Sequence, residues 1–167
     1  MISPTGKSRN AKPRSNIHPK ASFPDRMLLK DLVVIEPLFR AVPVLLKPGG
    51  HFTFTITHPC FQPPGMVKFA ETGEEEGILI RRNGVKVSHY RTSTAFRGIG
   101  IVGQTEPQYY FHRPLSEYLR VAFAAGFVVD GFEEPAFPAD GAKRSGLRWS
   151  EMPEVPPVAA VRLSNGN

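Results

Sequence analysis

Residues 49–61, GGHFTFTITHPCF, decide the fold that this sequence can adopt. From 51 to 57 the even-numbered side chains are apolar and most of the others are threonines, which is the two-residue period of a strand with one buried face. All residues from 52 to 57 are β-branched or aromatic, which favours a place inside a sheet. We therefore expect a strand over 51–57 that ends in a polar, bulky corner, HPCF at 58–61.

A helix is expected immediately before this strand, over residues 31–47. Pro37 suits a first helical turn, Pro43 predicts a kink, and the PGG sequence at 48–50 ends the helix. One apolar stripe is expected to face the core: Leu38, Val42, Leu45 and Leu46. A helix, a short turn and a strand form the second half of a βαβ unit.

The segments after the corner predict more elements of both kinds. A hairpin is expected over 78–91, with its turn at Asn83-Gly84, after a loop at 62–77. Residues 93–109 are expected to be irregular. A second helix is expected over 114–125, closed by Gly126 and buried through Leu115, Leu119, Ala122 and Phe123. Strands are expected over 127–132 and 157–163, so the fold class is α/β.

The charge distribution separates a tail from the body. The net charge is +6, and residues 1–22 hold five Lys or Arg side chains and no acidic one. We expect residues 1–24 to be a disordered basic tail and the body to be nearly neutral, so that nucleic-acid binding is not the main function. No apolar run reaches the roughly 20 residues of a membrane helix, so we expect no membrane partner.

Cysteine and histidine content limits the possible chemistry. Cys60 is the single cysteine, which excludes an intrachain disulfide and fits the cytoplasm. The spacing of the histidines matches no metal-ligand pattern, so no metal is expected. A nucleophilic role for Cys60 would need a lowered thiol pKa and an orienting group, and a small buried cysteine is the simpler interpretation.

Three stretches resemble class I S-adenosylmethionine (SAM)-dependent methyltransferases in the order of that family. They are LVVIEPLFRAVPVLLKPGGHFTFTITHPCF, YYFHRPLSEYLRVAFAAGFVVDGFEEP and EVPPVAAVRL, within residues 27–163. The resemblance implies a methyltransferase domain over 25–163, followed by a tail at 164–167. It also implies a partial Rossmann-like sheet with a β-hairpin insertion, SAM as cofactor, and methyl transfer to a small-molecule acceptor.

The sequence departs from the family where the cofactor would bind. The family holds SAM with a Gly-rich turn after its first strand and a carboxylate after its second. Gly6 is the only glycine before residue 49, so no cofactor-binding residue is assigned. We expect a truncated, C-terminal part of a methyltransferase whose exposed sheet edge favours self-association. The alternative is a non-catalytic remnant, or a subunit that needs a separate cofactor-binding half.

The corner after the first strand is a candidate acceptor site, because ligands of α/β sheets bind beyond the carboxyl ends of the strands. His58 would be a catalytic base or hydrogen-bond partner, and Cys60 and Phe61 would contact the acceptor. The alternatives are that His58 caps loop backbone and that Phe61 belongs to the core.

A second candidate segment directly precedes the second helix. By resemblance it lines the acceptor side, with His112 as a catalytic residue and Tyr110 and Arg113 as substrate-binding residues. The alternative for Arg113 is a structural clamp that pairs with Glu133 or Glu134 and fixes the start of the helix.

Overall fold

The structure, a computed structural model, describes residues 28–100, 103–135, 137 and 147–166. The expected tail at 1–24 and much of the loop before Trp149 lie outside the described residues. The helices are α1 (Glu36–Leu45) and α2 (Leu115–Ala124), with short 3-10 turns η1 (Leu28–Lys30) and η2 (Trp149–Glu151). The strands are β1 (His51–Thr57), β2 (Val67–Glu75), β3 (Ile78–Lys86), β4 (Thr94–Gly98), β5 (Gln108–His112), β6 (Phe127–Glu133) and β7 (Val158–Asn165).

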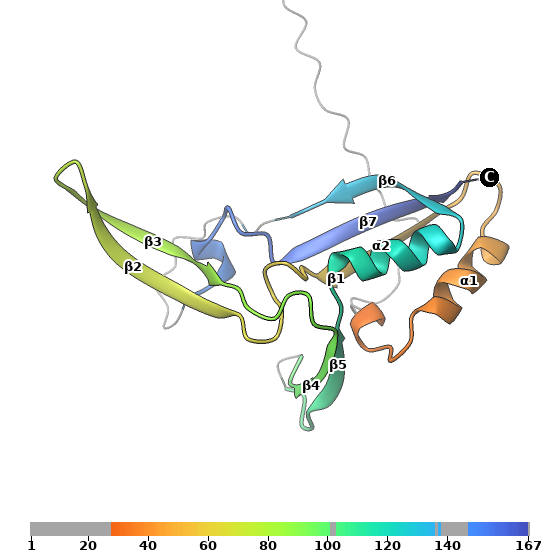
Figure 1. Cartoon of the computed structure of the whole chain (residues 1–167), viewed down its shortest axis with the longest axis horizontal. Coiled ribbons are helices and arrows are strands. Elements are labelled where there is room, and N and C mark those ends of the chain that lie inside the picture. Colours follow the sequence, from red (N-terminus) through yellow and green to blue (C-terminus); the bar gives the residue numbers. More distant parts are fainter. Residues whose placement is uncertain (1–27, 101–102, 136, 138–146, 167) are drawn as a thin grey trace, which may run out of the picture.

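A three-stranded sheet with the order β1-β7-β6 forms the body (Figure 1). The last strand, β7, lies between the other two and runs antiparallel to both, so β1 and β6 run parallel to each other. The α/β class expected from the sequence is therefore confirmed. β7 continues to Asn165, two residues beyond the end of the strand predicted over 157–163.

The core lies between one face of this sheet and the two helices. Phe54 and Ile56 of β1 are buried and pair across the ladder with Val161 and Ala159 of β7, as the alternation in the sequence predicts. Phe39 of α1 is fully buried at the centre. Its ring makes edge-on contacts with three other phenylalanine rings, those of Phe52, Phe54 and Phe127.

Both helices are rotated relative to the predicted stripes. α1 begins five residues later than expected, at Glu36, and Leu45 is 79% exposed. The position of Phe39 in the aromatic cluster sets the rotation of α1, which turns Leu45 toward solvent. In α2, Tyr118 and Val121 are buried in place of Phe123, which is 55% exposed. Gly126 follows α2 with a φ of +84°, a conformation that glycine adopts without strain.

The hairpin after β1 has a different turn from the predicted one. β2 and β3 form a long ribbon that projects from the body (Figure 1), and the turn lies at Glu76-Gly77. Both turn residues have positive φ, 51° and 79°, as a tight hairpin turn requires. Gly84 lies inside β3 opposite Phe69, whose ring would be 2.9 Å from an added Cβ. The prediction of a turn at Asn83-Gly84 is therefore wrong: Gly84 stands within β3, where the absence of a side chain makes room for the Phe69 ring.

A second ribbon, β4 with β5, occupies the segment that was expected to be irregular. Phe96 and Tyr110 face each other across it, with ring centroids 5.8 Å apart. A Cβ at Gly100 would collide with the Tyr110 hydroxyl, so the glycine there permits this close approach. β5 runs directly into α2 and carries the second candidate segment to the end of β1.

Candidate functional site

A small pocket lies at the carboxyl end of β1. Its walls come from five parts of the chain: η1, the corner after β1, β4, the end of β5 and α2. The lining residues are Lys30, Thr57, Pro59, Gln62, Phe96, Tyr110, Phe111, His112, Arg113 and Tyr118. Tyr110, His112 and Arg113 were expected in this site. His58, Cys60 and Phe61 are not among the lining residues, although their neighbours Pro59 and Gln62 are.

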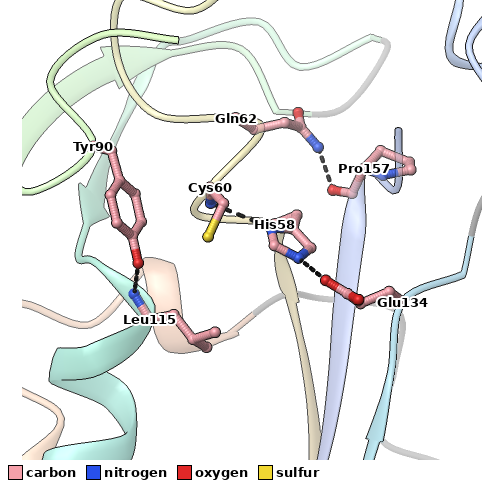
Figure 2. A network of polar contacts seen from close by, with 7 residues as sticks. All are labelled: His58, Cys60, Gln62, Tyr90, Leu115, Glu134 and Pro157. Carbon is pink, nitrogen blue, oxygen red and sulfur yellow. Dashed lines mark hydrogen bonds and ion pairs between the residues drawn. The ribbon is translucent and has the colours of Figure 1, made fainter. Parts of the chain in front are cut away.

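His58 anchors the corner to the rest of the sheet (Figure 2). It is 2% exposed, and its Nε2–H donates to Glu134 Oε1 at 2.6 Å. Its Nδ1 accepts the backbone N–H of Cys60 at 3.2 Å. These contacts correspond to the neutral Nε2–H tautomer. Both ring nitrogens therefore have protein partners, and the backbone-capping role considered from the sequence is present.

Cys60 and Phe61 complete the corner beside Tyr90. The Phe61 ring is tilted on the His58 ring, with centroids 4.6 Å apart. The Tyr90 hydroxyl accepts the N–H of Leu115 at 3.3 Å and so holds the start of α2 (Figure 2). Burial, and then a hydrogen bond with the Cys60 thiol, raise the pKa of Tyr90. Tyr90 therefore links the corner, through Cys60, to the start of α2.

His112 is the buried pocket residue with a fixed tautomer. Its Nε2–H donates to the backbone oxygen of Tyr90 at 2.8 Å. Among the described residues, no hydrogen-bond partner approaches its Nδ1. In the neutral imidazole this hydrogen bond places the proton on Nε2, so that Nδ1 is the ring nitrogen that can accept a proton from a ligand.

Arg113 acts as a clamp. It is 6% exposed, and its guanidinium donates to the oxygens of Leu32 and Val33 at 2.8 and 2.5 Å and reaches that of Leu29 at 3.5 Å. Its Nε lies 3.3 Å from Glu117 Oε1. The expected partners, Glu133 and Glu134, are wrong, because Glu134 binds His58 instead. The clamp joins the start of α2 to the segment that carries Lys30.

Lys30 and Tyr110 form one wall of the pocket. The Lys30 ammonium lies 4.3 Å from the centroid of the Tyr110 ring. Burial lowers the pKa of Lys30, and the charge of Asp31 opposes this shift. The Tyr110 hydroxyl accepts from Gln108 Nε2 at 2.8 Å. Lys30, Gln62 and Tyr118 were not predicted from the sequence. Lys30 and Gln62 lie far from Tyr110 along the chain, and the predicted apolar stripe of α2 did not include Tyr118.

Over residues 28–100, 103–135, 137 and 147–166, no group of three His, Cys, Asp or Glu side chains is placed to hold a metal ion. No helix in these ranges is long and apolar enough to cross a membrane.

Comparison with solved structures identifies the fold of this chain. No family profile and no curated protein matches the sequence significantly. A candidate SAM-dependent methyltransferase from Listeria monocytogenes aligns with 83% of this chain at 17% identity, with a TM-score of 0.60. A SAM-dependent methyltransferase from Mesorhizobium loti aligns with 82% at 23% identity, with a TM-score of 0.57. The chain covers 58% and 57% of these two proteins. It therefore has a class I SAM-dependent methyltransferase fold, over less than two thirds of their length.

The described residues do not fit the adenosyl part of SAM. β1 is the first described strand, and no glycine other than Gly6 precedes residue 49. A Gly-rich turn between a strand and a helix is what lets backbone amides approach such a nucleotide. No described residue is therefore assigned to cofactor binding.

Proposed function

We propose that this chain carries the acceptor-binding part of a SAM-dependent methyltransferase that acts on a small molecule. The fold shared with two methyltransferases supports the reaction class. The pocket at the carboxyl end of β1 supports the division of roles, because it is built from this chain alone. The cytoplasm is the proposed location, on the basis of the single cysteine.

His112 carries this proposal. Methyl transfer depends mainly on alignment of the reacting atoms, and a base is needed only when the acceptor starts protonated. The Tyr90 carbonyl keeps the proton on Nε2 of His112, so Nδ1 is available to take one from a bound acceptor. We therefore assign His112 as the catalytic base and Tyr110 as part of the pocket wall. Four other residues hold the segments that carry these two in place: Arg113, His58, Cys60 and Phe61.

A complementation experiment tests this proposal. The full chain is co-expressed with the part of the Mesorhizobium loti protein that it does not cover, and methyl transfer from labelled SAM to a pool of small acceptors is measured. We expect the pair to bind SAM and transfer the label. His112→Gln should lower turnover by about 100-fold or more, with unchanged SAM affinity. Unchanged turnover in a His112→Gln pair that still binds SAM would remove the assigned base.

We also propose that the chain associates through β1. Among the described residues β1 pairs with β7 on one edge only. An unpaired edge is a template for another strand, and a lysine on such an edge opposes pairing. Sedimentation velocity should show concentration-dependent association that Thr55→Lys weakens; a monomer at all concentrations would contradict the proposal.

A further inference from the structure

We propose that two copies of this chain dock through one face of the β2–β3 ribbon, with the two ribbons stacked antiparallel. This contact is independent of the proposed function and of the β1 edge, because it uses neither the pocket nor the three-stranded sheet. We call the docking surface the Phe69 face. Its apolar and glycine positions are Val67, Phe69, Gly73, Ile78, Ile80 and Gly84.

The register of the ribbon puts these six positions on one side. Directly paired residues of an antiparallel ladder share a face, and so do residues two apart along each strand. On this face Val67 is 59% exposed and Ile78 is 66% exposed. Among the described residues, the ion pairs and ring contacts of this face stay within the ribbon: Glu75 with Arg82, Glu71 with Lys86, and Lys86 over the Phe69 ring. A two-stranded ribbon is marginally stable in water by itself, so a second layer on this face would stabilise it.

The opposite face of the ribbon is held at its base by the same chain. Lys68 donates to the backbone oxygen of Leu147 at 3.3 Å, and its ammonium lies 4.2 Å from the centroid of the Trp149 ring. The side-chain amide of Asn83 donates to the backbone oxygen of Glu151 at 3.3 Å. The η2 turn therefore fixes the direction of the ribbon and leaves the Phe69 face as the side that a partner can cover.

The charges of the Phe69 face match those of a second copy turned end for end. They run from Lys86 at the base, through Glu71 opposite Arg82 at the centre, to Glu75 near the tip. A twofold axis across the ribbon, at the level of the central pair, places Lys86 of each copy at the end where the other copy has Glu75. A twofold axis along the ribbon would instead bring like charges together at both ends. The charge pattern therefore favours the antiparallel stack.

The shape of the face supports the same arrangement. Phe69 lies opposite Gly84 in the ladder, and Ile80 lies opposite Gly73, on either side of the central charged pair. The twofold axis across the ribbon lays the Phe69 row of one copy on the Ile80 row of the other. Each row then holds one large side chain and one glycine, so the two layers can approach to the usual spacing of about 10 Å. Because the ribbon projects from the body (Figure 1), the two bodies lie at opposite ends of the stack.

Sedimentation velocity of the full chain carrying Thr55→Lys tests this docking without a contribution from the β1 edge. We expect this chain to form a dimer whose dissociation constant can be measured. Ile78→Lys removes an apolar side chain from the Phe69 face and adds a cation where Lys86 of the other copy lies. It should raise the dissociation constant by about tenfold or more.

Leu79→Lys is the matched control for this variant. Leu79 follows Ile78 in the sequence and is 76% exposed, but it lies on the opposite face of the ribbon. The same charge is therefore added at the same end of the ribbon, and the dissociation constant should change by less than about twofold. Circular dichroism shows whether both variants keep the fold.

Crosslinking identifies the occupant of the Phe69 face and its direction. Unlabelled and isotope-labelled chains are mixed and treated with a carbodiimide, which joins an amine directly to a carboxylate. We expect links between the two kinds of chain that join Lys86 of one copy to Glu75 or Glu76 of the other.

Three outcomes would overturn the inference. They are a Thr55→Lys chain that stays monomeric at all concentrations, equal effects of Ile78→Lys and Leu79→Lys, and Lys86 links that join only residues of one copy. These results are distinct from failure of the proposed function. A chain whose ribbons dock but that never supports methyl transfer would keep this contact and lose the reaction.

Discussion

Replacing Arg113 by lysine tests whether this residue is a clamp or a ligand for the acceptor. The guanidinium donates to the oxygens of Leu32 and Val33, reaches that of Leu29, and pairs with Glu117. A lysine keeps the positive charge, but its single nitrogen cannot reproduce this fork. The charge therefore stays near the pocket while most of the structural contacts are lost.

The expected cost of Arg113→Lys follows from these contacts. Lysine can retain one of the backbone oxygens and loses about two charge-assisted hydrogen bonds in a site that is 6% exposed. Bonds of this kind contribute about 1.5 kcal/mol or more each, so we expect the free energy of unfolding to fall by about 3 kcal/mol. Arg120 lies on the exposed side of α2, and Arg120→Lys should change it by less than about 0.5 kcal/mol.

Urea denaturation followed by circular dichroism measures both variants under the same conditions. A loss below about 0.5 kcal/mol for Arg113→Lys, similar to that of Arg120→Lys, would refute the clamp. If Arg113 instead bound the acceptor directly, Arg113→Lys would leave the free energy of unfolding unchanged.

Three further predictions concern other parts of the molecule. Glu134→Ala removes the hydrogen-bond acceptor of the buried His58 imidazole and should lower the free energy of unfolding, measured in urea, by about 1 kcal/mol. Glu134→Gln keeps an acceptor and should lower it less, and equal losses for the two variants would contradict this. Gly84→Ala should accelerate hydrogen exchange along the β2–β3 ribbon, because the new Cβ meets a ring at 2.9 Å, whereas Gly73→Ala has 3.9 Å and should not. Burial raises the pKa of Tyr118 above 10.0, so its neutral form stabilises the fold below that pH and the stabilisation is lost as the pH rises through the raised pKa. Tyr118→Phe should therefore flatten the alkaline decline of urea midpoints, and an unchanged decline would contradict the assignment.

Elements whose patterns are local could be predicted from the sequence. The alternation from His51 to Thr57 gives β1 with the observed bounds, because one face meets the helices and the other does not. Gly126 likewise marks the end of α2, since its positive φ suits glycine.

Features that depend on distant contacts could not be predicted. The rotation of α1 is set by Phe39 meeting rings on β1 and β6, which the helix sequence alone does not reveal. Asn83-Gly84 has the composition of a hairpin turn, but Phe69 on the neighbouring strand determines why a glycine stands there. The β4–β5 ribbon was missed because Gly98, Gly100 and Gly103, at the end of β4 and between the two strands, give the segment the composition of a loop.

In the candidate site, too, the residues that are neighbours in the sequence were predicted and their distant partners were not. Tyr110, His112 and Arg113 were placed together because they are neighbours at the entrance of α2. The partners that decide their roles come from elsewhere: Tyr90 fixes the His112 tautomer, and the segment before α1 accepts the Arg113 hydrogen bonds. Lys30 belongs to the site only because that segment is clamped beside β5.

Calorimetric titration of SAM into the purified chain tests the central claim most directly. The claim is that this chain supplies the acceptor pocket and that its described residues do not form the cradle for the cofactor. We expect a folded chain that gives no saturable heat with SAM at micromolar concentrations. Saturable micromolar binding by the chain alone would contradict the account, because a cofactor site would then exist without the Gly-rich turn.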